Sequence, residues 1–446
     1  MKHIHSKLTQ TQMIVVGYIL IILIGSLLLM LPWASRSREV TPFLDTLFTA
    51  TSASCVTGLV VVDTWSHWSI FGQVIVLTLI QIGGMGFMTL GVYMAILLRR
   101  RIGLKTRGVL QESINSLQIG GIVKLAKKII QGTLLFESVG ALLLMYRFIP
   151  RFGLMRGIWY GIFHAVSAFC NAGFDLMGYT EPYLSLCGYA GDWLVNLTIM
   201  SLIVIGGIGF FVWDDIADKK LKIRRYTLHT KIVLMVTASL IIGGALFFFF
   251  AEQNNVMRNM PLAEQIWASF FQSVTARTAG FNTVDTGTLT EGSKFVTILL
   301  MFIGGSPGST AGGIKTTTLI VLLVCVRANI RQEHGYNILD RRLDEESVRK
   351  ACTVMCTNLL LMLTATIIML ALQPFALTDV LFEAASAIGT VGMTTGITRS
   401  VCSVSKIVLI FLMYCGRIGS LTFALSLRGN KHEPAVKQPV EQIMIG

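Results

Sequence analysis

The chain has 446 residues, of which 53% are hydrophobic and 14% are charged, and its formal net charge is +13. Soluble globular proteins carry about 25% charged residues, so this composition indicates long apolar segments that lie in a membrane. The positive charge does not indicate nucleic-acid binding, because the basic residues cluster in short loops between apolar spans and no aromatic–basic surface pattern occurs beyond these loops.

The first predicted element is an apolar helix over residues 13–33, which is long enough to span a bilayer. No small-residue cleavage site follows it cleanly, so we expect the helix to be retained. Seven more long apolar helices are predicted, over residues 69–98, 128–149, 191–213, 229–250, 294–326, 352–372 and 403–427. A shorter, half-apolar helix precedes each of residues 69, 191, 294 and 403, and it is too short to cross.

Four segments of the chain are visibly related. Each begins with Phe and a run of small residues, as in "FTATSASCVTGL" and "FQSVTARTAGFN", and reaches a glycine about ten residues later. These glycines are Gly58, Gly173, Gly280 and Gly392, and they are separated by 115, 107 and 112 residues. We therefore expect four repeats over residues 1–105, 106–218, 219–327 and 328–428, followed by a tail over 429–446.

The repeats predict an all-α membrane protein in which four helix–pore loop–helix units surround one central pore with pseudo-fourfold symmetry. Eight membrane-spanning helices would place both termini on one side of a cell membrane. Basic residues cluster at 99–128, 219–231 and 327–350, in alternate loops, and an excess of Lys and Arg marks the cytoplasmic side. Residues 99–107 and 219–225 are candidate surfaces for a partner or for lipid headgroups, or they act only as topology signals.

A second pattern recurs within the later helices, at "IGGMGF" (82–87), "IGGIGF" (205–210), "IGGSPG" (303–308) and "CGRIG" (415–419). Small residues at this spacing allow close helix packing, which is the alternative to a functional role for the first, second and fourth copies. The third copy continues to Lys315 with five glycines and a proline, so we predict a break with a loop that lines the pore. A phosphate-binding loop is excluded because Ile314 separates the last glycine from Lys315.

A short helix followed by an extended glycine segment exposes backbone carbonyls, and four such segments around an axis can replace the water around a dehydrated cation. Glycine suits this role because it leaves no side chain in the path. The predicted potassium-filter residues are Val56, Thr57, Gly58, Asn171, Ala172, Gly173, Thr278, Ala279, Gly280, Thr390, Val391 and Gly392.

Arg417 interrupts the last predicted helix about midway, where a charge is costly and usually functional. We interpret it as a positive plug below the filter, and snorkelling or a buried ion pair is the alternative. Lys315 is either a second positive element or the cytoplasmic edge of its span. The predicted gate residues are Gly304, Gly305, Gly308, Gly312, Gly313, Lys315 and Arg417.

The four segments "TSASCVTGL", "SAFCNAGFD", "TARTAGFNT" and "GTVGMTTG" make the chain resemble the Ktr/Trk/HKT superfamily of potassium transporters, most of all its bacterial KtrB-type membrane subunits. The resemblance covers residues 12–428. It implies potassium selectivity, since a filter glycine stands in all four repeats. It also implies a homodimer on which a separate, KtrA-like cytosolic ring with nucleotide-binding domains docks. The chain itself has no nucleotide-binding fingerprint, so we expect no cofactor in it and a nucleotide only on that partner.

Three other classes of function are weighed against an ion pore. An enzyme would need convergent His, Asp or Cys groups, and those in the apolar spans are scattered. An alternating-access or sodium-coupled secondary transporter also uses repeats and broken helices, but its repeats are often inverted, whereas these four run in the same direction. A non-conducting receptor would have no use for four carbonyl-presenting loops.

Overall fold

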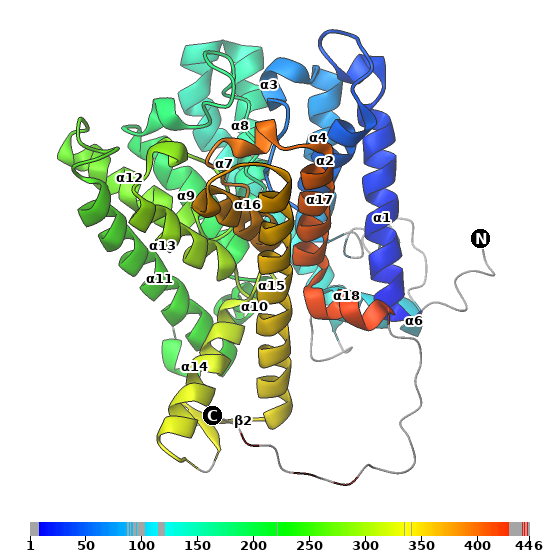
Figure 1. Cartoon of the computed structure of the whole chain (residues 1–446), viewed down its shortest axis with the longest axis vertical. Coiled ribbons are helices and arrows are strands. Elements are labelled where there is room, and N and C mark those ends of the chain that lie inside the picture. The colour runs from blue at the N-terminus through cyan, green and yellow to red at the C-terminus, as the bar shows by residue number, and fades with distance from the viewer. Residues whose placement is uncertain are drawn as a thin grey trace.

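The structure is a computed structural model that describes residues 9–86, 103–114, 121–220, 222–333, 335–339 and 341–427, with isolated positions 89, 91, 95, 439, 441 and 444. Most of the predicted tail over residues 429–446 lies outside the described residues. The first helix of each quarter forms as expected (Figure 1): α1 (Gln10–Leu29), α7 (Ile122–Phe152), α11 (Leu228–Glu252) and α15 (Glu345–Leu372). All four are long and apolar enough to cross a membrane.

Polar residues fix where these long helices begin. Thr9 forms a capping box with Gln12 at the start of α1: Gln12 N donates to Thr9 Oγ1 at 3.2 Å, and Thr9 N donates to Gln12 Oε1 at 3.1 Å. At the start of α15, Ser347 N donates to Asp344 Oδ2 at 2.9 Å. These contacts satisfy backbone N–H groups that a helix leaves without internal partners.

A shorter helix follows each long one: α2 (Phe43–Ser54), α8 (Leu154–Phe169), α12 (Leu262–Thr275) and α16 (Leu377–Gly389). At 1.5 Å per residue the longest reaches about 24 Å, less than the roughly 30 Å of a bilayer core. From Phe48, Phe163, Phe271 and Phe382 onward, these helices are almost wholly buried. Their C-terminal ends therefore point into the protein, as the sequence predicts.

The helices that end the quarters are broken. The break between α13 (Glu291–Phe302) and α14 (Thr316–Ile330) confirms the prediction for the third quarter. In the other quarters one continuous helix was expected, and this is wrong for the second and fourth. There, α9 (Trp193–Gly207) is followed by α10 (Phe210–Lys219), and α17 (Ser403–Ile418) by α18 (Ser420–Leu427), each after a bend of 95°. Figure 1 shows α18 lying across the end of α17. In the first quarter α4 (Ile70–Met85) ends at Gly86, and most of the predicted remainder to residue 98 lies outside the described residues.

The glycine-rich pattern explains both the packing and the breaks. Its last glycine has a positive φ in Gly86, Gly209 and Gly419 (78°, 98° and 94°), a conformation that ends a helix and disfavours other residues. Its second position packs closely, since a Cβ on Gly83 would collide with the carbonyl oxygen of Ser54. Gly206 and Gly416 lie in the same way against Phe169 O and Ile388 O. The close packing expected for the first, second and fourth copies is therefore present together with the breaks.

The remaining elements are short. They are η1 (Pro32–Ala34), α3 (Thr64–His67), α6 (Leu104–Ile114), η2 (Cys187–Tyr189), η3 (Ile223–Arg225), η4 (Thr286–Thr288), η5 (Ile397–Ser400), β1 (Tyr336–Ile338) and β2 (Arg341–Leu343). The antiparallel hairpin of β1 and β2 pairs Asn337 with Arg342, and it is a departure from the all-α expectation. By length and composition, the described residues contain four to six spans, and α4 and α14 are shorter apolar helices.

The first and last quarters of the chain lie side by side (Figure 1). Lys406 Nζ lies 2.6 Å from Asp45 Oδ1, and Tyr414 Oη donates to Val15 O at 2.7 Å. These contacts form a seam between α17 on one side and α1 and α2 on the other.

Candidate functional site

The four repeat glycines, Gly58, Gly173, Gly280 and Gly392, form a closed ring, here called the glycine ring. A Cβ on Gly58 would lie 2.5 Å from Ala172 O, and one on Gly173 would lie 2.5 Å from Ala279 O. A Cβ on Gly280 would collide with Val391 O, and one on Gly392 would collide with Thr57 O. Each glycine thus packs against the carbonyl of the residue before the next glycine, in cyclic order. No side chain fits at any of the four positions.

The end of each short helix positions its glycine segment through the backbone. Thr57 N, Ala172 N and Val391 N donate to the carbonyl oxygens five residues earlier, at 2.8, 2.8 and 2.9 Å. In the third quarter Ala279 N donates to Thr275 O at 2.9 Å, four residues earlier, which is the spacing of an ordinary helical turn. The third segment is therefore the one that departs from the shared geometry.

Backbone strain also distinguishes the third quarter from the other three. The residues two positions before the glycine have positive φ values in three quarters: 50° at Val56, 58° at Asn171 and 51° at Thr390. Thr278, at the same place in the third quarter, does not. Left-handed backbone is uncommon for residues other than glycine, above all for β-branched ones, and it gathers where function requires it.

Hydroxyl groups hold these strained segments, and the sequence reasoning did not name them. Ser52 Oγ accepts a hydrogen bond from Gly58 N at 3.1 Å, and Ser386 Oγ accepts one from Gly392 N at 3.0 Å. Ser167 and Thr275 instead donate to the carbonyl after the glycine, Phe174 O and Phe281 O, each at 2.7 Å. The signal was a Ser or Thr five or six residues before each glycine.

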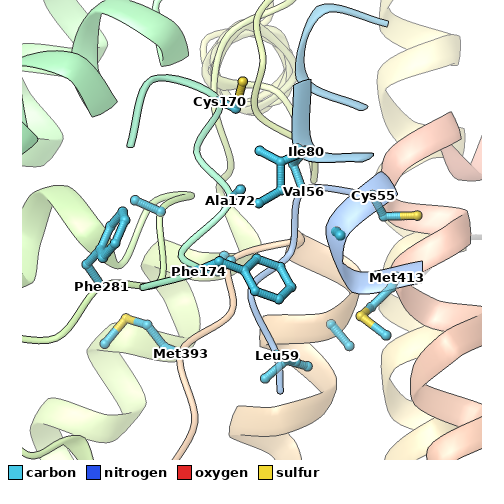
Figure 2. Packing of buried hydrophobic residues seen from close by; sticks show 14 of the residues in the cluster. Cys55, Val56, Leu59, Ile80, Cys170, Ala172, Phe174, Phe281, Met393 and Met413 are labelled. Carbon is cyan, nitrogen blue, oxygen red and sulfur yellow. The ribbon is translucent and has the colours of Figure 1, made fainter. Parts of the chain in front are cut away.

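The residue that follows each glycine anchors the ring from outside. These residues are Leu59, Phe174, Phe281 and Met393, and all are at most 1% exposed. Figure 2 shows them on four segments that converge from different parts of the chain. Their burial in the protein core holds the segments in place.

The groups that this site can offer to a ligand are oxygen atoms. The carbonyls of Thr57, Ala172, Ala279 and Val391 lie at the ring, and the buried hydroxyls of Thr57 and Thr390 have no hydrogen-bond partner among the described residues. Carbonyl and hydroxyl oxygens suit a hard monovalent cation. No cluster of three His, Cys, Asp or Glu side chains that could bind a transition metal occurs in the described part of the chain.

Residues 303–315, here called the intramembrane loop, lie against this ring. Ile303 and Ile314 pair as a parallel bridge, and Ser306 N and Thr310 N donate to Gly207 O and Gly206 O at 3.0 and 3.2 Å. The loop therefore occupies the break between α9 and α10. Its glycines allow close contact: a Cβ on Gly312 would collide with the Thr390 side chain, and one on Gly304 would collide with Gly312 O.

The other predicted loop glycines also lie at close contacts or turns. A Cβ on Gly305 would collide with that of Ala311. Gly308 and Gly313 have positive φ values of 64° and 68°, and Gly308 O accepts from Phe210 N at 2.7 Å. All five loop glycines predicted for the gate thus belong to one compact segment.

A side-chain network joins the ring to the loop, and the sequence did not reveal it. Asn171 Nδ2 donates to Thr310 Oγ1 at 2.7 Å, while Asn171 Oδ1 accepts from Thr278 Oγ1 at 2.9 Å. Thr310 Oγ1 also donates to Phe169 O at 3.1 Å. Asn171 and Thr278 were predicted for their backbone, but here their side chains connect two quarters with the loop.

Arg417 holds the loop from the opposite side. It lies in the last turn of α17, not midway along a continuous helix, and its guanidinium donates to Thr310 O, Gly83 O and Gly84 O. No acidic partner of Arg417 occurs among the described residues. The alternative of a buried ion pair is therefore not supported, since backbone carbonyls satisfy the charge.

Beyond the loop, Arg417 and Lys315 line one cavity of about 260 Å³. Lys315 Nζ donates to Ala311 O at 2.7 Å, so the side chain folds back onto the loop. The cavity is also lined by Gly84, Gly308 and Asn358. The glycine ring, the intramembrane loop and this cavity thus follow one another in space, with two positive charges at the loop.

A ring of backbone oxygens among helices long and apolar enough to cross a membrane fits the class of membrane transport proteins for cations. The family described as "TrkH: Cation transport protein" matches residues 4–433. The chain belongs to this family.

Relatives of the chain match over its full length. It is 39% identical to the "Potassium/sodium uptake protein NtpJ" of Enterococcus hirae, covering 100% of this chain and 99% of that protein. It is also 39% identical to the "Ktr system potassium uptake protein B" of Bacillus subtilis, covering 99% and 97%. The crystal structure of the potassium transporter TrkH from Vibrio parahaemolyticus matches 92% of this chain and 84% of that chain, with a TM-score of 0.69 and 19% identity. The chain therefore shares its fold with that solved structure.

Proposed function

We propose that the chain is the potassium-conducting membrane subunit of an uptake system, with its selectivity filter at the glycine ring. The single observation that carries this proposal is the closed cycle of contacts among Gly58, Gly173, Gly280 and Gly392. Four helix–pore loop–helix repeats, pseudo-fourfold symmetry and eight membrane crossings are its architectural counterpart. Two relatives are named as potassium uptake proteins, and these names support the same ion.

Potassium fits because its hydration shell can be replaced by carbonyl oxygens presented around an axis. The twelve predicted filter residues, from Val56–Thr57–Gly58 to Thr390–Val391–Gly392, would supply these oxygens. The hydroxyls of Thr57 and Thr390, which lack partners among the described residues, are available to the ion or its water. The short-helix C-termini, with their partial negative charge, face the same place and favour a cation.

The intramembrane loop and Arg417 would form the gate below this filter. The loop lies between the ring and the cavity, and Arg417 fastens it through three backbone carbonyls. Opening would require these charge-assisted hydrogen bonds to break and the loop to move toward the cavity. Lys315, bonded to the loop itself, would move with it as a second positive element.

The same proposal includes the orientation of the protein in the membrane and its partners. Both termini and the basic loops would face the cytoplasm, and the protein would lie in the cell membrane as a homodimer. The Bacillus subtilis relative is named as part of a "Ktr system", which supports a multi-component assembly. A KtrA-like cytosolic ring would bind the cytoplasmic face and carry the regulatory nucleotide, with no cofactor in this chain. Residues 99–102, part of one candidate docking surface, lie outside the described residues.

Sodium coupling is the second candidate, because the Enterococcus hirae relative is named for potassium and sodium. A sodium-coupled carrier would move potassium only when sodium is present on the same side. Potassium uptake into proteoliposomes with and without external sodium distinguishes coupling from simple conduction.

Substitution of each ring glycine by serine tests the filter. We expect Gly58→Ser, Gly173→Ser, Gly280→Ser and Gly392→Ser each to reduce potassium uptake at least tenfold or to admit sodium, because each Cβ meets a carbonyl. Gly396→Ser is the matched control: its φ is 103°, yet no atom lies within 4 Å of the added Cβ. Equal uptake by the ring variants and the control would overturn the proposed filter.

A further inference from the structure

A groove of about 900 Å³ lies between the first and second quarters, and none of the ring glycines lines it. Its walls come from η1, α3, the start of α4 and the start of α8. Figure 1 places α3 at the end of the molecule where α1 finishes. The lining residues include Arg36, Arg38 and Arg156 together with Trp33, Trp65 and Trp159. Among the residues that the structure describes, no acidic side chain lines it.

Two of the three arginines have no ion pair among the described residues, and the third is held by the protein. Arg38 and Arg156 are exposed and form no ion pair among the described residues, although Glu39 follows Arg38 in the chain. Arg36 is fixed in place: its Cζ lies 3.9 Å from the centre of the Trp65 ring, and its Nε donates to Trp68 O at 3.3 Å.

The charges in this groove also act on one another. Burial lowers the pKa of the Arg36 guanidinium and the charge of Arg156 lowers it further, while Tyr160 and, to a smaller extent, Asp63 act in the opposite direction. Asp63 is already engaged, since its carboxylate accepts from Ser66 N at 2.7 Å and Tyr183 N at 3.0 Å. An anion in the groove would relieve the repulsion between the two arginines.

The edge of the groove is apolar and exposed. Trp33 is 74% exposed, Ile70 71% and Met155 82%, and all three line the groove. These residues lie at the ends of membrane helices, where tryptophan is typical of the bilayer interface. A ligand that satisfies both parts needs an anionic head and an apolar tail.

We propose that this groove binds one phospholipid with an anionic headgroup, whose phosphate contacts Arg38 and Arg156 and whose acyl chains lie along Ile70 and Met155. The choice of leaflet rests on the topology proposed above, which would place this groove in the outer leaflet. Positive residues are depleted on that side of membrane proteins, so two exposed arginines there without ion pairs among the described residues favour an anionic ligand. Each basic residue near an anionic lipid surface raises the binding affinity several-fold.

The test uses the full-length protein in detergent, titrated with phosphatidylglycerol, phosphatidylcholine or inorganic phosphate, and followed by native mass spectrometry and thermal unfolding. We expect phosphatidylglycerol alone to be retained and to raise the unfolding temperature. In the double variant Arg38→Gln/Arg156→Gln its affinity should fall on the order of tenfold. The matched control Arg258→Gln/Arg349→Gln removes two exposed arginines that do not line the groove and form no ion pair among the described residues, and it should bind the lipid normally.

Other outcomes overturn the lipid site. Equal retention of phosphatidylcholine would show no headgroup recognition, and an equal effect of inorganic phosphate would show an anion site without lipid. A change of oligomeric state in the double variant with unchanged lipid binding would assign the groove to a second copy of the chain. Potassium flux in phosphatidylcholine vesicles, measured on the same variants, separates failure of this site from failure of the proposed pore.

Discussion

Asn171 shows how one residue serves two purposes. Its backbone has a positive φ of 58° within the ring segment, while its side chain reaches Thr310 in the intramembrane loop. An amide can donate and accept at once, and here it accepts from Thr278 while it donates to Thr310. The loop is thus hydrogen-bonded directly to the second ring segment and, through Asn171, to the third.

Replacing Thr310 by valine keeps the shape of the side chain and removes both of its hydroxyl contacts. If the loop closes the pore, the closed state should lose about 1 kcal/mol, which is about a fivefold rise in the open fraction. Rubidium flux into proteoliposomes measures this change. Thr297→Val, which loses only a bond to Ser293 O within α13, is the control. Additive effects of Thr310→Val and Asn171→Ala would contradict the direct coupling.

Substitutions of Arg417 can separate the effect of its positive charge from the effect of its hydrogen-bond geometry. Lysine keeps the positive charge but cannot reproduce a planar fork that reaches Thr310 O and the carbonyls of Gly83 and Gly84. We expect Arg417→Gln to raise basal flux most, by tenfold or more, and Arg417→Lys to raise it by an intermediate amount. If lysine behaved as arginine does, a point charge rather than the fork would close the path. Unchanged flux in both variants would remove Arg417 from the gate.

At the scale of elements, the intramembrane loop depends on the absence of side chains. A methyl group on Gly312 would collide with Thr390, so the loop could not keep its present position. Overpacking of this kind costs about 1–3 kcal/mol. Gly312→Ala should therefore shift the loop away from the ring and raise rubidium flux several-fold. Gly243→Ala, which meets nothing within 4 Å on α11, should leave flux unchanged, and lower flux in Gly312→Ala would argue against the gate.

Sequence patterns were sufficient for elements whose cause is local. The long helices α1, α7, α11 and α15 follow from the length of an apolar run, and the loop after Phe302 follows from its glycines and proline. The sequences around Gly209 and Gly419 are also rich in glycine. They contain fewer glycines than the loop after Phe302, however, so they were also compatible with a closely packed continuous helix. The dihedral angles at these glycines, not their number, decide the outcome.

Contacts between distant segments could not be predicted in this way. Asn171 and Thr310 are 139 residues apart, and nothing in either neighbourhood specifies the other. The groove around Arg38 and Arg156 likewise joins two quarters of the chain. The repeat did predict that four glycines belong together, because equal spacing is itself long-range information. Their cyclic contacts agree with that prediction, while their role as an ion filter stays a proposal.

At the scale of the whole molecule, the proposed topology has a direct test. Asn337 on β1 and Ser400 in η5 are both exposed, and the proposal places them on opposite sides of the membrane. In a variant without native cysteines, Ser400→Cys should react with an impermeant maleimide on intact cells. Asn337→Cys should react only after the membrane is opened. Labelling of both in intact cells, or of Asn337→Cys alone, would contradict a cytoplasmic location of the basic loops.

The contact between Gly392 and Thr57 joins the beginning of the chain to a segment that is synthesised last. During membrane insertion the first three glycine segments must wait, with one position vacant, until α16 arrives. If the ring is the proposed filter, an ion entering at that stage would find only three of its protein oxygen donors. The proposed ion path would then be completed only by the last quarter of the chain to be made.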